Sequence, residues 1–220
     1  MQVMPQLERF TSRQAPFAIA KALTATAKQV QQAMGLATNT AFDRPTSFTQ
    51  KAFAYLPARK DKLQAIVFAK DKQARYLKFG VQGGGRRVKG FEKKFNSMTN
   101  ADEQAGASML VPTKKIKRTA QGNVSMSTLK RITADMNTYN TAGRFFIGKP
   151  KGRGANAGRG YGIYARTNNN NKIEALMVFA NSPTYKKRFD MSAIGRKKVD
   201  EAFEANLRAA WATALATARR

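Results

Sequence analysis

Residues 43–83 read DRPTSFTQKAFAYLPARKDKLQAIVFAKDKQARYLKFGVQG, and this stretch decides the fold class. After an opening turn, Thr46 or Ser47 can cap a short helical turn. Residues 53–57 look extended, and residues 63–69 form a second run rich in Ile, Val and Phe. A Lys-Asp pair between the two runs is a turn candidate, so we predict a β-hairpin.

The rest of the chain adds helices and further antiparallel strands. We expect a helix at 72–80 that closes at Gly80 and the glycines 83–85, strands at 109–111 and 144–148, a helix at 124–140 and a hairpin of 161–166 with 173–180. The expected inward side of the helix at 124–140 consists of Met126, Leu129, Ile132 and Met136. Strands and helices do not alternate regularly, which disfavours a doubly wound parallel sheet.

Two long helices bracket these elements. Residues 11–34 favour an amphipathic, alanine-rich helix with a capping box at Thr11 and Gln14 and an end at Gly35. Its alanines permit the close approach of a neighbour, within the fold or in another subunit. Residues 192–218 favour a second long helix. The expected apolar face of that helix consists of Ile194, Val199, Phe203, Leu207, Trp211 and Leu215.

The predicted fold class is α+β, with an antiparallel sheet of hairpins flanked by long N-terminal and C-terminal helices and with basic glycine-rich loops. We expect one domain over residues 1–220, because an apolar fraction of 42% is adequate for a core. Residues 84–108 and 149–160 are predicted to be basic, glycine-containing loops or arms, the first with a helical piece around residues 90–98. No apolar run approaches the roughly 20 residues that span a bilayer. The N-terminus has no apolar stretch of signal-peptide type. We therefore expect no membrane partner and synthesis in the cytoplasm.

The charge narrows the function. Forty Lys and Arg residues against thirteen Asp and Glu give a net charge of +27, and the chain has no His and no Cys. Such a surplus attracts a polyanion or is neutralised inside a larger assembly. The missing side chains remove the usual proton shuttle at neutral pH, the thiol nucleophile and the usual metal ligands. We predict a structural or binding protein, not an enzyme, with no cofactor.

Positive charge gathers in the middle of the chain, where residues 86–159 carry sixteen Lys or Arg against four Asp or Glu, a net +12. GGGRR at 83–87 and KGRGANAGRG at 151–160 are glycine-rich, and residues 114–118 hold four cations in five positions. Each segment can contact phosphate. A flexible surface loop is the plainer interpretation of 83–87, and 151–160 can equally be a loop that orders against a neighbouring subunit. For 114–118, phosphate contact and a solvated surface are equal alternatives. The candidate phosphate- or partner-contacting residues are Arg86, Arg87, Lys89, Lys114, Lys115, Lys117, Arg118, Arg153 and Arg159.

Two further patterns have plain alternatives. Asp71, Glu92 and Lys94 match the acidic pair and lysine of metal-dependent nucleases, but chance readily produces this match in a lysine-rich chain. Four aromatic residues could stack on bases, but core packing is the stronger interpretation because their neighbours are apolar. These aromatic residues are Phe145, Phe146, Tyr161 and Tyr164.

Five spaced segments suggest a family. They are DRPTSFTQKAF, LQAIVFAKDKQARYLKFGVQGG, LVPTK after a basic linker, RFFIGKP and GYGIYAR. With them, residues 43–83 and 109–166 resemble the minor tail, tail-completion or neck proteins of tailed bacteriophages, including lambda-type tail-completion proteins. The resemblance implies a ring of identical subunits at the head–tail junction or tail end, and no active site.

These observations lead to one main expectation and two alternatives. We expect a structural virion protein of a tailed phage, part of the neck or tail-completion region that joins tail to head. Its expected partners are copies of itself in a ring, neighbouring tail, tube or connector proteins, and packaged DNA. The first alternative is an independent DNA-binding protein that uses the basic surface. The second is a Mg²⁺-dependent nuclease that uses Glu92.

Overall fold

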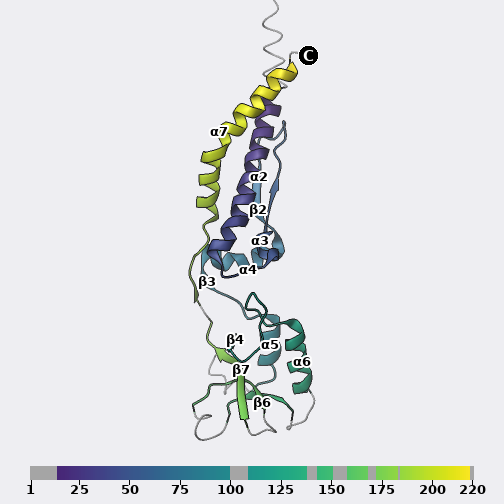
Figure 1. The fold of residues 1–220 in the computed structure, drawn as a ribbon, viewed down its shortest axis with the longest axis vertical. Helices are drawn as coiled ribbons and strands as arrows, with labels where there is room; N and C mark the ends of the chain where they lie inside the picture. The colour runs from purple at the N-terminus through teal and green to yellow at the C-terminus, as the bar shows by residue number, and fades with distance from the viewer. Residues whose placement is uncertain are drawn as a thin grey trace, which may run out of the picture. The chain divides into compact units, whose positions relative to one another are not determined.

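The computed structural model describes residues 14–99, 109–137, 143–150, 158–167, 172–182 and 184–218 (Figure 1). The chain divides into two compact units: unit 1 comprises residues 1–83 and 186–220, and unit 2 comprises residues 84–185. From the sequence we expected one domain over residues 1–220. The structure instead has separate hydrophobic clusters in the two units, because the apolar residues of 84–185 close on a sheet of their own.

The described part of unit 1 is a hairpin packed on helices. Its elements are α2 (Ala15–Ala41), α3 (Ser47–Gln50), β1 (Phe53–Leu56), β2 (Ile66–Ala69), α4 (Asp71–Gln82) and α7 (Met191–Ala218). Both predicted long helices are therefore present, as α2 and α7.

Helix α2 continues past its predicted end. It runs through Gly35 to Ala41, and Gln14 at its start makes no side-chain cap hydrogen bond. Thr11, the other half of the predicted capping box, lies outside the described residues. A Cβ at Gly35 would lie 3.0 Å from the carbonyl oxygen of Gln50. The glycine therefore lets α3 approach α2 closely and does not end the helix.

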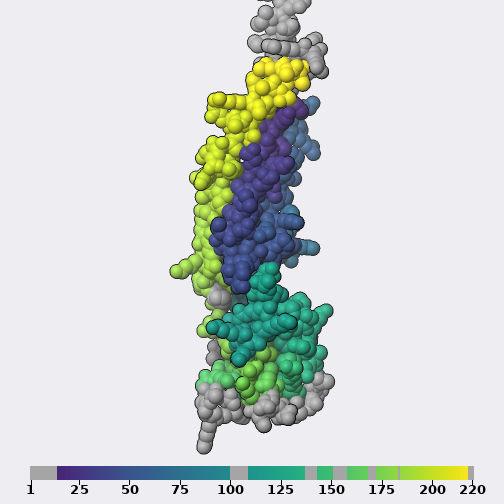
Figure 2. Space-filling view, viewed as in Figure 1, coloured from purple at the N-terminus to yellow at the C-terminus, as the bar shows by residue number. Residues whose placement is uncertain are grey.

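Helices α2 and α7 pack along each other, as the space-filling view shows (Figure 2). The side chains at their contact include small ones. Ala18 and Ala22 of α2 are 0% exposed, and Ala210 and Ala214 of α7 are 4% exposed. Alanines at a helix contact shorten the distance between the two axes. The alanines of α2 thus serve packing within the fold.

The predicted apolar face of α7 is only partly correct. Phe203, Leu207 and Trp211 pack against the alanine cluster. Val199 and Leu215 are 41% and 45% exposed. The contact with α2 follows the alanines, so these two larger residues lie outside it.

The hairpin of unit 1 forms as predicted. Thr46 caps α3, its hydroxyl oxygen accepting the N–H of Thr49 at 3.2 Å. Strands β1 and β2 pair antiparallel, with Phe53 opposite Ala69. Phe53 is 2% exposed and stacks on Phe189 with ring centroids 5.6 Å apart. One face of the hairpin is therefore part of the core of unit 1.

Helix α4 runs past the predicted last residue Gly80 to Gln82, and it closes at the first of the glycines 83–85, as predicted. Gly83 adopts φ 76°, a conformation that favours glycine, and caps the helix. Gly80 lies inside the helix, where a Cβ would come within 2.8 Å of the Phe42 ring. Its carbonyl oxygen accepts the N–H groups of Arg188 and Phe189 at 2.7 and 3.0 Å. Gly80 therefore joins α4 to the segment that precedes α7.

Unit 2 is built on an antiparallel four-stranded sheet in the order β4-β7-β6-β5. Its elements are β3 (Gly84–Gly85), α5 (Gly90–Asn96), β4 (Met109–Pro112), α6 (Met126–Asn137), β5 (Phe145–Gly148), β6 (Gly162–Thr167), β7 (Lys172–Ala180) and β8 (Thr184–Tyr185). Every strand pair in the described chain is antiparallel. The predicted α+β class with antiparallel hairpins is confirmed.

The core of unit 2 lies between the sheet and its helices. Leu129 and Ile132 of α6 are buried, and Met136 packs against them, as predicted. Met126 is 64% exposed, so its predicted inward position is wrong. It is the first residue of α6, where the helix extends past the edge of the buried cluster.

The first predicted arm contains some regular structure, whereas the described residues of the second, 149–150 and 158–160, form no helix or strand. Within 84–108, Gly84 and Gly85 pair with β8 and residues 90–96 form α5. Residues 100–108 and 151–157 lie outside the described residues. Of the helices that the structure does describe, none has both the length and the apolar composition needed to cross a bilayer.

Candidate functional site

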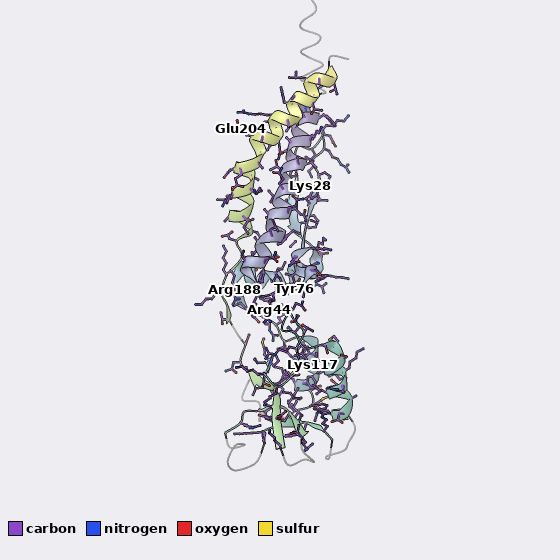
Figure 3. All side chains as sticks on the ribbon, viewed as in Figure 1. Lys28, Arg44, Tyr76, Lys117, Arg188 and Glu204 are labelled. Atoms are coloured by element: carbon purple, nitrogen blue, oxygen red, sulfur yellow. The ribbon has the colours of Figure 1, made fainter. Side chains whose placement is uncertain are left out.

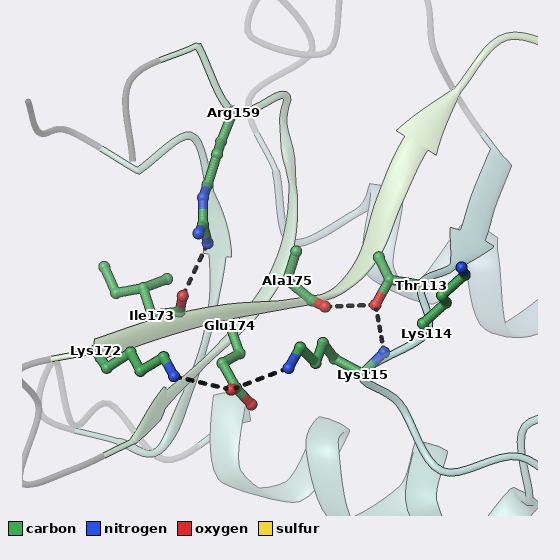
Figure 4. Close-up of a pocket in the computed structure, with 8 residues that line it drawn as sticks. All are labelled: Thr113, Lys114, Lys115, Arg159, Lys172, Ile173, Glu174 and Ala175. Carbon is green, nitrogen blue, oxygen red and sulfur yellow. Dashed lines mark hydrogen bonds and ion pairs between the residues drawn. The ribbon is translucent and has the colours of Figure 1, made fainter. Parts of the chain in front are cut away.

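A groove on the sheet of unit 2 gathers several of the predicted cations (Figure 4). Its volume is about 320 Å³. We call it the basic groove, and its lining consists of Thr113, Lys114, Lys115, Arg159, Lys172, Ile173, Glu174 and Ala175. Lys114, Lys115 and Arg159 were predicted as contact residues. Lys172 was not predicted, because only the pairing of β4 with β7 brings it to this place.

Thr113 and Arg159 fix the two sides of the basic groove against β7. The Thr113 N–H donates to the carbonyl oxygen of Leu176 at 2.9 Å, and its hydroxyl donates to that of Ala175 at 2.5 Å. The Arg159 guanidinium donates to the carbonyl oxygen of Ile173 at 2.8 Å. These bonds attach two loops to one strand, so the cations share a rigid support.

The basic groove carries a net positive charge. Four cations and one carboxylate, that of Glu174, give +3. The ammonium groups of Lys115 and Lys172 each lie 3.8 Å from the same Glu174 oxygen, and their side chains are 63% and 67% exposed. Such solvent-exposed ion pairs contribute little stability. Both lysines can therefore turn to an incoming phosphate or carboxylate group.

Ile116 anchors the rest of the cationic loop. It is 4% exposed and belongs to the core of unit 2. Lys117, labelled in Figure 3, is exposed. The Arg118 guanidinium donates to the carbonyl oxygens of Pro112 and Thr113 at 2.5 and 2.8 Å. Arg118 therefore shapes the loop, while Lys117 faces solvent.

Arg86, another predicted phosphate contact, is the partner of a buried carboxylate. Glu92 is 0% exposed, and two guanidinium nitrogens of Arg86 donate to its two oxygens at 2.7 and 2.6 Å. The N–H groups of Lys89 and Leu110 donate to the same carboxylate at 2.6 and 3.2 Å. Burial alone would raise the pKa of Glu92, but the hydrogen bonds from Arg86 and the two N–H groups outweigh it and lower the pKa. Arg86 thus has a structural role here.

Two other candidate cations, Arg87 and Lys89, do not line the basic groove. Arg87 and Lys89 are exposed, and the Lys89 ammonium lies 6.0 Å from the centroid of the Phe91 ring. Arg153 lies outside the described residues. The structure therefore joins Lys114, Lys115 and Arg159 into one site and does not unite all nine candidates.

Of the three residues that match the nuclease pattern, Asp71, Glu92 and Lys94, Glu92 is a poor metal ligand. All four hydrogen bonds to Glu92 use its carboxylate oxygens, which have about four acceptor positions. Asp71 belongs to the first turn of α4 in unit 1. Across the part of the chain that the structure describes, no three Asp or Glu side chains cluster closely enough to hold a metal ion. The geometry gives Glu92 a role in folding.

The aromatic residues of β5 and β6 serve the core. Tyr164 and Phe145 are 1% and 8% exposed. Phe146 stacks on Tyr164 with ring centroids 5.5 Å apart, and Tyr161 lies 5.5 Å from Phe179. Core packing, the stronger interpretation from the sequence, is confirmed for Phe145, Tyr161 and Tyr164. Phe146 is half-buried, and the Arg166 guanidinium lies 4.5 Å from the centroid of its ring.

The outer face of the β1–β2 hairpin is an exposed apolar surface that we did not predict. Leu56, Ile66 and Phe68 are 52%, 40% and 38% exposed. Leu56 pairs with Ile66, and Phe68 is two residues further along β2 on the same face. We call these three residues the apolar hairpin face. A signal existed in the sequence, because FAYL and IVFA are apolar on both faces instead of alternating with polar residues.

Comparison with known proteins gives no relative: no protein-family model, no curated protein and no solved structure matches this chain.

Proposed function

We propose that this chain is a structural subunit of a tailed-phage virion, which assembles with copies of itself in the neck or tail-completion region. The apolar hairpin face is the observation that carries the assembly. Adjacent large apolar side chains on a protein surface mark a site of contact with another molecule. In a chain of net charge +27, assembly also requires anionic neighbours that offset the repulsion between copies.

The hairpin itself favours a covering partner. One face packs in the core of unit 1 through Phe53, and the other presents Leu56, Ile66 and Phe68 to solvent. A two-stranded sheet is marginal in water, and apolar residues on both faces are typical of strands covered on both sides. A neighbouring subunit would supply the second cover. Identical contacts repeated around an axis close into a ring.

The resemblance of the sequence to tail-completion and neck proteins supports the location in a virion. This part of the proposal predicts that purified phage particles contain the chain. The expected result, by mass spectrometry of particle fractions, is that the chain stays with the neck or tail fraction after heads and tails are separated. Its absence from purified particles would contradict the location.

Substitution in the apolar hairpin face tests the assembly. We expect the wild-type chain, at a salt concentration high enough to screen the repulsion between copies, to give a mass above the 24.3 kDa of one subunit in light scattering coupled to gel filtration. Phe68→Ser should shift the population toward single subunits. Leu36→Ser is the matched control, because Leu36 is 70% exposed on α2, outside the apolar hairpin face, and should leave the mass unchanged. A wild-type chain that stays a monomer at every concentration would overturn the assembly.

The basic groove favours a second candidate function, the binding of DNA. Its four cations come from strand β7 and from two loops hydrogen-bonded to that strand, and Lys117 continues the charge on one of these loops. Lysines act as point charges on phosphates and carry little sequence specificity. The expected activity is therefore salt-dependent binding to DNA without base selection.

A salt series with two charge-matched variants tests this second candidate. Lys114→Gln/Lys115→Gln/Lys172→Gln removes three charges from the groove and should reduce the slope of log K against log salt by about 2 to 3. The control, Lys93→Gln/Lys94→Gln/Lys130→Gln, removes three exposed charges of α5 and α6 in the same unit. Equal effects of the two variants would show binding by general charge and would remove the groove as a site.

A further inference from the structure

Unit 1 has a larger groove, between the first half of α2 and the turn that follows β1. Its volume is about 780 Å³, within the range of about 300–1,000 Å³ usual for binding sites. We call it the unit 1 groove. Its lining consists of Phe17, Ala20, Lys21, Thr24, Ala25, Lys28, Pro57, Ala58, Arg59 and Lys60.

The walls of the unit 1 groove are fixed by hydrogen bonds. The Thr24 hydroxyl donates to the carbonyl oxygen of Ala20 at 2.8 Å and accepts the N–H of Ala58 at 3.1 Å. The backbone groups of Arg59 and Lys62 exchange two hydrogen bonds of 3.0 Å, which close the turn. One wall is therefore a helix face, the other a closed turn, and Thr24 joins them.

Cations stand on both walls around an apolar floor. Lys21 and Lys28 come from α2, and Arg59 and Lys60 come from the turn. None of the lining residues is acidic; the nearby Asp61 lines a different groove. Among the ion pairs of the described residues, none involves any of these four cations. The apolar part consists of Phe17, which is 58% exposed, Ala20, Ala25, Pro57 and Ala58.

We propose that the unit 1 groove binds an acidic, amphipathic segment of a partner protein. Carboxylates of that segment would pair with Lys21 and Lys28 on one wall and with Arg59 and Lys60 on the other. A large apolar side chain of the segment would cover Phe17 and Pro57. The four cations favour a segment with carboxylates on one side, and the apolar lining favours a segment with large apolar side chains on the other side.

A peptide fits this surface better than a nucleic acid does. A phosphate backbone satisfies cations but offers no apolar group to cover Pro57 and the alanines of the floor. Nucleic-acid sites without sequence preference combine cations with several aromatic platforms, whereas Phe17 is the one aromatic residue in this lining.

A second copy of this chain is a poor occupant. The densest acidic run on the described chain is Asp200, Glu201 and Glu204 of α7, where Figure 3 labels Glu204. Lys198 pairs with Glu201 at 2.6 Å, and Arg208 pairs with Glu204 at 2.5 Å. A copy would therefore bring cations along with these carboxylates. The occupant is a different, acidic chain.

Fluorescence anisotropy with the full chain tests the inference. The probe is a labelled peptide of about 14 residues with Glu and Leu at helical spacing, long enough to span about 20 Å. We expect Lys21→Gln/Lys28→Gln to weaken its binding about tenfold and Phe17→Ser about threefold. Lys51→Gln/Lys72→Gln removes two exposed charges of unit 1 outside the groove and should stay within about twofold of wild type. Unchanged thermal unfolding of every variant shows that the fold is intact.

Three results would overturn the inference: no binding of the peptide, equally tight binding of poly-glutamate, or a DNA oligonucleotide that binds more tightly than the peptide with the same dependence on Lys21 and Lys28. The inference goes beyond the proposed assembly and does not depend on it. Phe68→Ser should keep full affinity for the peptide, so failure of the assembly and failure of the groove are distinguishable.

Discussion

Replacement of Glu92 by Gln should destabilise unit 2 severely. The carboxylate is fully buried and accepts four hydrogen bonds, two on each oxygen: Arg86 and Leu110 donate to one, Arg86 and the Lys89 N–H to the other. An amide has one oxygen and one NH₂ group. Whichever way the amide is oriented, two donors would face the NH₂ group and lose their acceptor.

The expected cost follows from these contacts. Breaking a buried ion pair costs about 3–5 kcal/mol, because the remaining charge stays buried without compensation. That is a large fraction of the roughly 5–15 kcal/mol that stabilises an ordinary domain. For a unit of this size, the unfolding temperature should fall by more than about 10 °C.

Urea unfolding at neutral pH measures the loss of stability, and hydrogen exchange followed by mass spectrometry shows where in unit 2 the loss occurs. Loss of protection should concentrate in residues 86–96 and in β4, which carry the donors and the acceptor. The double variant Arg86→Met/Glu92→Leu should lose less free energy of unfolding than Arg86→Met and Glu92→Leu lose in sum, because the double variant leaves no charge buried. Glu204→Gln is the control, because that carboxylate pairs with Arg208 at 74% exposure and should matter little. A Glu92→Gln chain whose free energy of unfolding lies within about 1 kcal/mol of wild type would refute the structural role of the Arg86–Glu92 ion pair.

Three further predictions concern stability. Acid should weaken unit 2, because the pKa of Glu92 in the folded chain lies below its ordinary value. The stability that Glu92 contributes is therefore complete above about pH 4.3 and is lost as the pH falls through the folded pKa. Circular dichroism against pH should show this loss in wild type and not in Arg86→Met/Glu92→Leu. Gly162→Ala should lower the free energy of unfolding in urea by roughly 2 kcal/mol or more, because its Cβ would lie 2.4 Å from the Met177 carbonyl oxygen. In the control, Gly160→Ala, the Cβ meets only a side chain at 3.4 Å. Equal stability of the two variants would contradict the register between β6 and β7. Ala22→Leu should cost about 1–3 kcal/mol by overpacking the contact of α2 with α7, while Ala209→Leu, on the exposed side of α7, should be nearly neutral; the reverse order would place the contact on another face.

Local pattern was sufficient for most elements of this fold. Thr46 as a cap, the two apolar runs around a Lys-Asp turn and the Asn-rich turn between 161–166 and 173–180 predicted elements that the structure contains. These signals act between residues close in sequence, where capping, turn preference and the alternation of side chains are set by the backbone itself. The +27 charge likewise required only composition, and it predicted an anionic neighbour without saying where that neighbour binds.

The roles of individual side chains depended on partners far away in the chain. The sequence predicted a helix end at Gly35, but the role of this glycine is set by the contact with Gln50. Lys172 lines the basic groove only because β7 pairs with β4. Arg86 looked like a free phosphate contact because nothing in its segment reveals that Glu92 is buried and needs a cation. Propensity and charge are properties of a residue and its neighbours, whereas burial is a property of the packed chain. Burial decides which cations remain open to a ligand, and tertiary structure alone determines it.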